Sequence, residues 1–400
     1  MDSYSPSPFR LGFLLSLVSS LQMFQQSLLA SLTDAGLSST QLAFASATFP
    51  LGKVVSTLWL LLCTSSPDVV FNLKVAARLL MFGGLVAGLP VLPALSIGRL
   101  LMGAGTGIGF VCAPLYLTEL IPYSSRPAHF FVLGVAFAGS TLMANALALA
   151  HFTERSLTLF SSGFAFISGL IYLLLAPEQH PFASTLPVQP TDPTRISGRP
   201  VALSNALMLL NVTCGVPVLL GFAPIIFEEF GLSPDHSFKL SLLFPTAQVF
   251  LLSLLHFHPG LLSRKTLILG GYGVAVFVLF AITTTAKYPF LPDAQKSVAL
   301  AGWLFVLTLV TSVPCNTALC VIAEQFPSGT EEQMSVASLS RTLMWLFSAI
   351  STSTFVPMIR SYGLTVTFLP YAMSSLLLLG LIMMWMPIIV DDEPEPAQCV

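Results

Sequence analysis

Long apolar runs, broken by proline, glycine and charged residues, follow one another along the whole chain. A helix that crosses a bilayer needs about 20 mostly apolar residues, and twelve runs reach that length. Six precede a polar stretch, at 10–32, 40–63, 74–93, 96–118, 129–150 and 157–176. Six follow it, at 201–227, 238–258, 266–286, 298–322, 334–359 and 364–388. The pattern predicts an all-α polytopic membrane protein with twelve transmembrane helices.

The polar stretch at 177–200 divides these runs into two equal sets. It is rich in proline, serine and threonine and has no hydrophobic periodicity, which is typical of a linker. We therefore expect a six-helix bundle over 1–176, a cytoplasmic linker over 177–200, and a second six-helix bundle over 201–400 that ends in a short acidic tail.

The composition supports a membrane protein and excludes several other classes. The chain is 54% hydrophobic and 8% charged, whereas soluble domains carry roughly a quarter charged residues. The net charge of −2 gives no basis for nucleic-acid binding. The cysteines show no metal-ligand spacing, and no nucleophile–base pair is recognisable. We expect no enzyme activity, no catalytic residues, no metal and no cofactor.

The basic residues beside the predicted spans give the orientation. Eight lie on the side that also holds both chain ends, and six, among them Arg99, lie on the other side. Cytoplasmic loops carry the excess of Lys and Arg, so both termini are predicted to be cytoplasmic. We expect a multi-pass protein of the plasma membrane.

One segment, 98–126, combines packing and charge. Glycines at 98, 103, 105, 107 and 109 follow the helix from its start, and the segment ends in Glu119, Pro122 and Arg126. In lipid, such small residues let helix backbones approach closely. The same spacing returns 205 residues later in Glu324, Pro327 and Glu331. Two related halves are therefore predicted, and a transporter is the expected function.

The charges of these two motifs are candidates for a cytoplasmic gate. Opposite charges from two halves can pair across their seam and separate as the halves rock apart. The alternative is a set of solvated charges worth at most about 1 kcal/mol per pair. The predicted gating residues are Glu119, Arg126, Arg264, Glu324 and Glu331.

The motif at 98–126 resembles the fourth-helix motif of the sugar porter family, the facilitative glucose transporter-like branch of the major facilitator superfamily. Ala323–Pro327 is similar to that family's tenth-helix end, and Pro177-Glu178 to the start of its P-E-S motif. The resemblance implies two pseudo-symmetric bundles with the major facilitator fold and transport by alternating access.

This chain departs from the family pattern at several functional positions. Glu331 stands where the resemblance implies an arginine, and 211–217 keeps only one amide and one glycine of the seventh-helix motif. The tenth-helix P-W pair falls on Ala318 and Leu319. The chain therefore resembles a divergent member of the family. Most of the hydrogen-bonding groups by which the family binds a hexose are absent at the matching positions.

Amide side chains inside apolar spans are candidates for the solute site, because buried polar groups are costly and mark pathways. Amides donate and accept hydrogen bonds without charge, which suits a sugar or related polyol. The alternative is that each amide bridges two helices. The predicted substrate-binding residues are Gln22, Gln26, Asn145, Asn211, Gln248 and Asn316.

Two cations, Lys53 and Arg341, fall inside predicted spans and are candidate contacts for an anion. The alternative is that they snorkel to the interface from misplaced span boundaries. No Asp or Glu falls in mid-span, and proton-coupled carriers usually relay protons through buried acids or histidines. Facilitated diffusion is therefore favoured over symport.

The sequence thus predicts a membrane transporter that moves a small polar solute, a sugar above all, by alternating-access facilitated diffusion. The alternatives are a carrier of a small organic anion and a non-transporting sensor on a carrier scaffold. The expected partners are the solute and the lipid bilayer, and the oligomeric state is not predicted.

Overall fold

The computed structural model describes residues 8–28, 39–63, 68–150, 153–176, 198–287 and 292–390, and these residues are all-helical. The first half contains α1 (Pro8–Val18), η1 (Leu21–Met23), α2 (Phe24–Ser27), α3 (Ser39–Cys63), α4 (Val69–Ala87), α5 (Leu92–Leu120), η3 (Tyr123–Ser125), α6 (Arg126–Leu149) and α7 (Glu154–Leu175). The second half contains α8 (Gly198–Thr213), α9 (Val216–Glu229), α10 (Pro234–Phe257), α11 (Arg264–Lys287), α12 (Asp293–Glu324) and α13 (Glu331–Val390).

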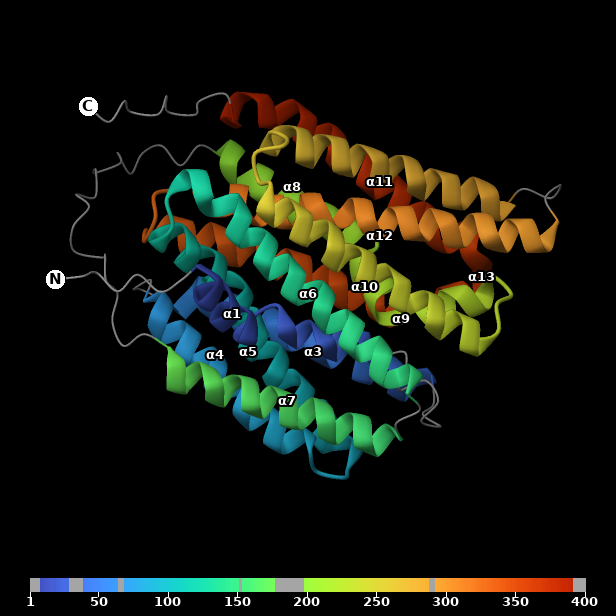
Figure 1. The fold of residues 1–400 in the computed structure, drawn as a ribbon, viewed down its shortest axis with the longest axis horizontal. Helices are drawn as coiled ribbons and strands as arrows, with labels where there is room; N and C mark the ends of the chain where they lie inside the picture. The colour runs from blue at the N-terminus through green and yellow to red at the C-terminus, as the bar shows by residue number, and fades with distance from the viewer. Residues whose placement is uncertain are drawn as a thin grey trace.

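The helices of each half pack together, and two helix pairs form the most extensive contacts between the halves. In Figure 1, α3, α4, α5 and α7 lie in the lower part of the molecule, and α10, α11 and α12 lie in the upper part. Across the boundary, α3 packs along α13 and α6 packs along α10. The boundary between the halves therefore runs through the centre of the molecule.

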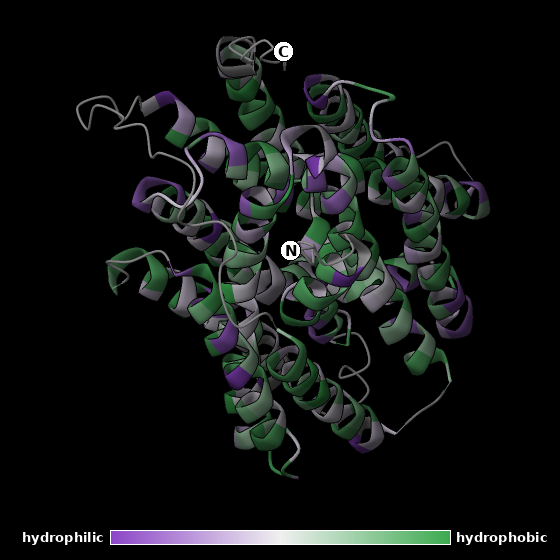
Figure 2. Cartoon of the chain, turned by 60° about the vertical axis from the view of Figure 1, so that its left-hand side comes forward, coloured by the Kyte–Doolittle hydropathy of each residue, from purple (hydrophilic) through white to green (hydrophobic). Residues whose placement is uncertain are grey.

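The outer surface is apolar, as lipid requires. Leu174, Phe250 and Val298 each expose more than seventy per cent of their area, and Figure 2 shows apolar residues along the sides of the helices. Ten of the described helices are long and apolar enough to cross a membrane. The broken first span and the kink that α13 contains account for the difference from the twelve predicted runs. The predicted fold class is confirmed.

The first predicted span, 10–32, is not one continuous helix. α1 ends at Val18, and a 3-10 turn leads into the single turn of α2. The Ser19 hydroxyl donates to the Leu15 carbonyl, and the Gln22 amide donates to the Leu17 carbonyl. Such local side-chain bonds give the backbone an alternative to the regular helix, so the uninterrupted span was a wrong expectation.

The seventh predicted span, 201–227, is also broken. Gly215, with φ of 84°, separates α8 from α9, and Pro217 stands at the start of α9. Glycine tolerates positive φ without steric cost, and proline has no amide hydrogen to donate. The chain therefore turns in the middle of the membrane, close to Asn211.

Three helix boundaries of the structure lie at or beside glycines and caps, and two of these helices begin before the predicted starts at 74 and 201. A single non-helical residue, Gly363, divides α13 between the eleventh and twelfth predicted spans. α4 begins at Val69 because the Asp68 carboxylate accepts from the Phe71 amide. α8 begins at Gly198, so the last residues of the expected linker 177–200 are helical, and 177–197 lies outside the described residues.

α5 is the central helix of the first half. It packs against α3 and α4, and two of its glycines make the closest approaches. A Cβ added at Gly103 would lie 2.1 Å from the Phe49 carbonyl oxygen of α3, and one at Gly109 would lie 2.0 Å from the Val18 carbonyl oxygen of α1. Only glycine permits these backbone contacts, as the sequence pattern predicted.

Candidate functional site

A cavity lies between the two halves, where residues from both sets of helices converge. It encloses about 970 Å³ of empty space, including the part open to solvent. Its polar wall consists of Ser19, Ser20, Gln26, Asn211, Gln248, Thr311, Ser312, Asn316 and Ser348. Three aromatic rings, Phe110, Phe137 and Trp345, complete it. Apolar walls with a few placed polar groups are typical of small-molecule sites.

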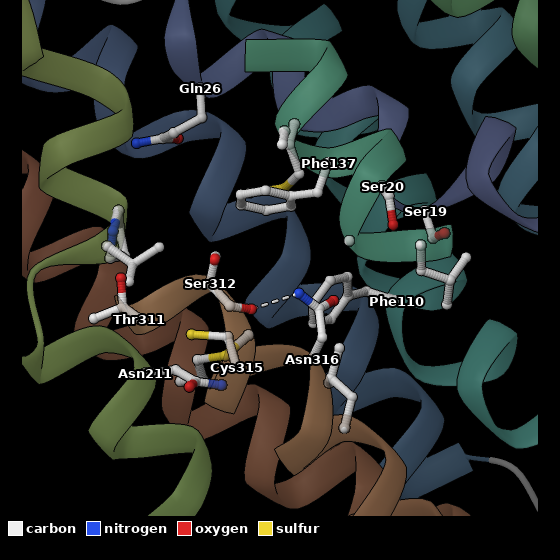
Figure 3. A pocket seen from close by; sticks show the side chains of 18 of the residues that line it. Ser19, Ser20, Gln26, Phe110, Phe137, Asn211, Thr311, Ser312, Cys315 and Asn316 are labelled. Atoms are coloured by element: carbon white, nitrogen blue, oxygen red, sulfur yellow. Dashed lines mark hydrogen bonds between the residues drawn. The ribbon is translucent and has the colours of Figure 1, made fainter. Parts of the chain in front are cut away.

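Four of the six predicted amides line this cavity: Gln26, Asn211, Gln248 and Asn316. Gln26 lies across the cavity from Asn211 (Figure 3). The Gln248 amide donates to the Thr308 carbonyl at 2.7 Å. The Asn316 amide donates to the Ser312 carbonyl at 2.7 Å, the dashed line of Figure 3. These bonds hold Gln248 and Asn316 in fixed orientations.

The structure places the other two amides, Gln22 and Asn145, outside the cavity lining. Gln22 donates to the Leu17 carbonyl at 3.2 Å in the 3-10 turn. That turn interrupts the regular helix between Gln22 and Gln26. The Asn145 amide donates to the Ser241 carbonyl at 2.8 Å, so it bridges α6 and α10 between the halves.

The aromatic wall was missed by the sequence reasoning. Phe110 of α5 and Trp345 of α13 meet edge to face with centroids 5.4 Å apart, so this contact joins the two halves. The Trp345 indole nitrogen is buried and has no hydrogen-bond partner among the described residues. Phenylalanine is frequent in every span and gives no signal, whereas Trp345 is one of four tryptophans in the chain.

Lys53 and Arg341 are fully buried, with no exposed area, so snorkelling is a wrong explanation for both. The Lys53 ammonium donates to the Met23 sulfur at 2.9 Å and lies 3.6 Å from the Trp345 ring centroid. The Arg341 guanidinium donates to the Phe110 carbonyl at 3.2 Å. The two helices that hold these cations, α3 and α13, pack against each other.

Arg99 is a third buried cation, although its position was counted among the outer flanking residues. It is 1% exposed on α5. Its guanidinium donates to the Ala45 carbonyl at 3.2 Å and to the Gln25 carbonyl at 3.1 Å. Its position therefore says nothing about orientation, and backbone carbonyls take the place of a carboxylate.

A charged cluster closes one end of the boundary between the halves. Glu324, at the end of α12, accepts from Arg126 of α6 at 3.4 Å and forms a closer ion pair with Arg264 of α11. The Arg264 guanidinium carbon lies 4.1 Å from the Tyr123 ring centroid. Since Arg126 and Tyr123 come from the first half, this cluster ties the halves together.

The other two predicted gating residues, Glu119 and Glu331, also lie near this end of the molecule. Glu119 faces the loop before α13, since a Cβ added at Gly329 would lie 4.0 Å from its carboxylate. Glu331 is exposed at the first residue of α13 and forms no ion pair with the described residues. Of the five predicted gating residues, the structure pairs Arg126 and Arg264 with Glu324.

Within the described residues, no group of three or more His, Cys, Asp and Glu side chains could hold a metal ion. Every described Asp and Glu lies at a helix end or in a turn. The cavity therefore presents amides, hydroxyls and rings, with cations directly behind its wall.

Comparisons with known proteins agree with this architecture. The model of the family "Sugar (and other) transporter" matches residues 192–393. The structure of the proton:xylose symporter XylE bound to 6-bromo-6-deoxy-D-glucose aligns with a TM-score of 0.75 at 16% identity, over 95% of this chain and 96% of that one. XylE from E. coli in a partially occluded inward-open conformation gives 0.74 at 17% identity, over 96% and 98%.

A further similar structure is that of the human organic anion transporter MFSD10 (TETRAN), with a TM-score of 0.66 at 16% identity, over 94% of this chain and 98% of that one. No curated protein sequence matches the chain. The structural matches establish the major facilitator fold, and the family model covers half of the chain. The chain belongs to the sugar transporter family and is a multi-pass membrane transporter with the major facilitator fold.

Proposed function

We propose that this transporter moves a small polyhydroxy solute, a sugar or a related polyol, through the central cavity by facilitated diffusion. The observation that carries the proposal is the composition of the cavity wall. Amide groups of Gln26, Gln248 and Asn316 stand beside the rings of Phe110 and Trp345. Sugars offer hydroxyls to the amides and apolar ring faces to the aromatic groups. XylE, the similar structure named above, is a xylose symporter.

Facilitated diffusion is proposed because a proton relay is missing from the described part of the cavity. No Asp, Glu or His belongs to its lining. The buried cation Arg99 is held by two backbone carbonyls in place of an acid. Without a carboxylate or an imidazole among the described lining residues, the cavity lacks the groups that usually couple solute movement to protons.

The charged cluster supports alternating access. Glu324, Arg126 and Arg264 hold one end of the boundary closed. Breaking the Arg126–Glu324 contact would let the halves rock apart and open the cavity on that side. We place this end in the cytoplasm, with both chain termini, and we place the protein in the plasma membrane. The units that rock are the bundles 1–176 and 201–400.

The proposal is tested by uptake of labelled D-xylose and D-glucose into proteoliposomes that contain the purified protein. We expect saturable uptake of at least one sugar until the inside and outside concentrations are equal. An inward proton gradient should leave both the rate and the final level unchanged. Liposomes without protein serve as the control. Accumulation above equilibrium under the proton gradient would show symport, and the absence of saturable uptake of every sugar tested, neutral or acidic, would refute the proposal.

A further inference from the structure

Lys53 lies directly behind the wall of the cavity. Its ammonium nitrogen is 2.9 Å from the Met23 sulfur and 3.6 Å from the centroid of the Trp345 ring. Met23 and Trp345 both line the cavity, whereas Lys53 itself has no exposed area. A single layer of side chains therefore separates a cationic group from the solute.

The positive charge on this side of the cavity has no carboxylate counterpart. Among the described residues, ion pairs are formed by Arg126, Lys239 and Arg264, and neither Lys53 nor Arg341 takes part in one. Lys53 is surrounded by a thioether and by the Phe49 and Trp345 rings. Buried charges are costly unless they are paired, so an anionic solute beside the Trp345 ring would offset part of the cost of a charged Lys53.

The cavity wall also has two donors without acceptors. The Gln26 amide nitrogen and the Trp345 indole nitrogen have no hydrogen-bond partners among the described residues. Gln26 is 2% exposed, Trp345 is 5% exposed, and both line the cavity. A buried donor left unpaired loses its interaction with water and gains nothing in return. A ligand rich in acceptor atoms would satisfy both donors.

A carboxylate meets these conditions, since it is negatively charged and has only acceptor oxygens. A carboxylate in contact with the Trp345 ring would lie less than about 10 Å from the Lys53 ammonium. In the low effective dielectric of a closed cavity, an attraction between unit charges over that distance is substantial. A neutral hydroxyl at the same place gains much less electrostatic energy from the Lys53 charge.

We infer that the preferred solutes are sugar acids, polyhydroxy compounds with one carboxylate, and that Lys53 supplies the positive potential that selects them. This inference rests on the proposed function, because it places the solute in the same cavity. The hydroxyls of the sugar acid meet the amides of the wall, and its carboxylate lies beside the Trp345 ring, the side on which Lys53 lies.

The experiment compares uptake of labelled D-glucuronate and D-glucose, which share a pyranose ring and differ in one carboxylate. Proteoliposomes are clamped at zero membrane potential with valinomycin and equal potassium, so that the charge of the solute does not oppose its entry. We expect kcat/KM for glucuronate to exceed that for glucose by about tenfold or more. Glucose uptake with no preference for glucuronate overturns this inference alone. Failure to take up either sugar overturns the proposed function as well.

Variants at Lys53 identify the source of the selectivity. Lys53→Met keeps the length of the side chain and removes the charge, so the ratio of glucuronate to glucose uptake should fall about tenfold. Lys53→Arg keeps the charge and should keep the preference. Lys287→Met removes the same charge from an exposed site at the end of α11 and should leave the ratio unchanged. If Lys53→Met leaves the ratio of glucuronate to glucose uptake unchanged, Lys53 does not select the solute.

Discussion

Gln22 and Gln26 carry the same side chain four residues apart, yet their surroundings differ. The Gln22 amide is held by the Leu17 carbonyl within a turn. The Gln26 amide nitrogen lines the cavity without a partner. A solute hydroxyl that accepts from Gln26 relieves the cost of a buried unpaired donor, which is about 1–3 kcal/mol. Gln26 is therefore expected to contribute to binding and Gln22 to local structure.

Replacing Gln26 with methionine should raise KM for the transported sugar about tenfold, which corresponds to about 1.4 kcal/mol. Methionine has a similar length and cannot donate, so the cavity keeps its volume and loses one hydrogen bond. Initial rates of uptake into proteoliposomes measure the change. Gln22→Met is the matched control, and it should change KM by less than twofold. Equal effects of the two substitutions would contradict this assignment.

Single residues show where sequence reasoning about the site succeeds and where it stops. The amides could be found because polar side chains are rare in apolar runs. Which of them face the solute depends on backbone breaks near Ser19 and Gly215. Arg99 could not be placed, since a cation at the edge of an apolar run is also typical of a membrane interface. Only the Ala45 and Gln25 carbonyls, far apart in sequence, reveal its burial.

At the scale of an element, α5 organises the first half because its glycines let three neighbouring helices approach. Gly103 meets the backbone of α3, and Gly109 meets the backbone of α1. By contrast, Gly163 of α7 has no atom within 4 Å of its added Cβ position. The two kinds of glycine differ in packing, although both lie within apolar helices.

Gly103→Ala should destabilise the protein by about 1–3 kcal/mol, the usual cost of overpacking a dense core. The new methyl group would overlap the Phe49 carbonyl oxygen, so α3 and α5 must move apart. Gly163→Ala introduces the same methyl group into open space and should not lower stability. Thermal unfolding of the two purified variants in one detergent measures the difference. Equal melting temperatures would show that the close approach of α3 and α5 at Gly103 does not contribute to the stability of the protein.

The elements themselves could be predicted well from the sequence, because lipid requires continuous apolar helices of a fixed length. The twelve apolar runs correspond to the described helices, with exceptions at the first and seventh spans. A hydropathy pattern does not reveal these breaks, because serines and glycines like Ser19 and Gly215 also occur within unbroken spans. The breaks arise from side-chain bonds and from a positive φ angle. The same breaks place Gln26 and Asn211 at the cavity.

At the scale of the whole molecule, the boundary between the halves is held in two different ways. Along its length, helix pairs α3–α13 and α6–α10 pack side by side. Thr342 of α13 also hydrogen-bonds Thr57 of α3 at 2.8 Å. At one end, the cluster of Glu324, Arg126 and Arg264 adds charge. Its acid is 9% exposed, so solvent screens it less than a surface pair.

Glu324→Gln should favour the conformation that is open at this end. The substitution keeps the shape of the side chain but removes the charge that two arginines share, at a cost of about 1–2 kcal/mol. Cys315 of α12 lines the cavity and can report access to it once the other five cysteines are replaced with alanine. We expect its alkylation by N-ethylmaleimide to become about tenfold faster, because about 1.4 kcal/mol changes a population tenfold.

Glu331→Gln is the matched control for this measurement, since it makes the same chemical change at an exposed residue that forms no ion pair with the described residues. Its alkylation rate should equal that of the parent protein. Saturating sugar should also slow the alkylation of Cys315 in both proteins, because the sugar occupies the cavity that Cys315 lines. Equal rates for the two variants would mean that helix packing alone keeps this end closed, and that the cluster has no role in gating.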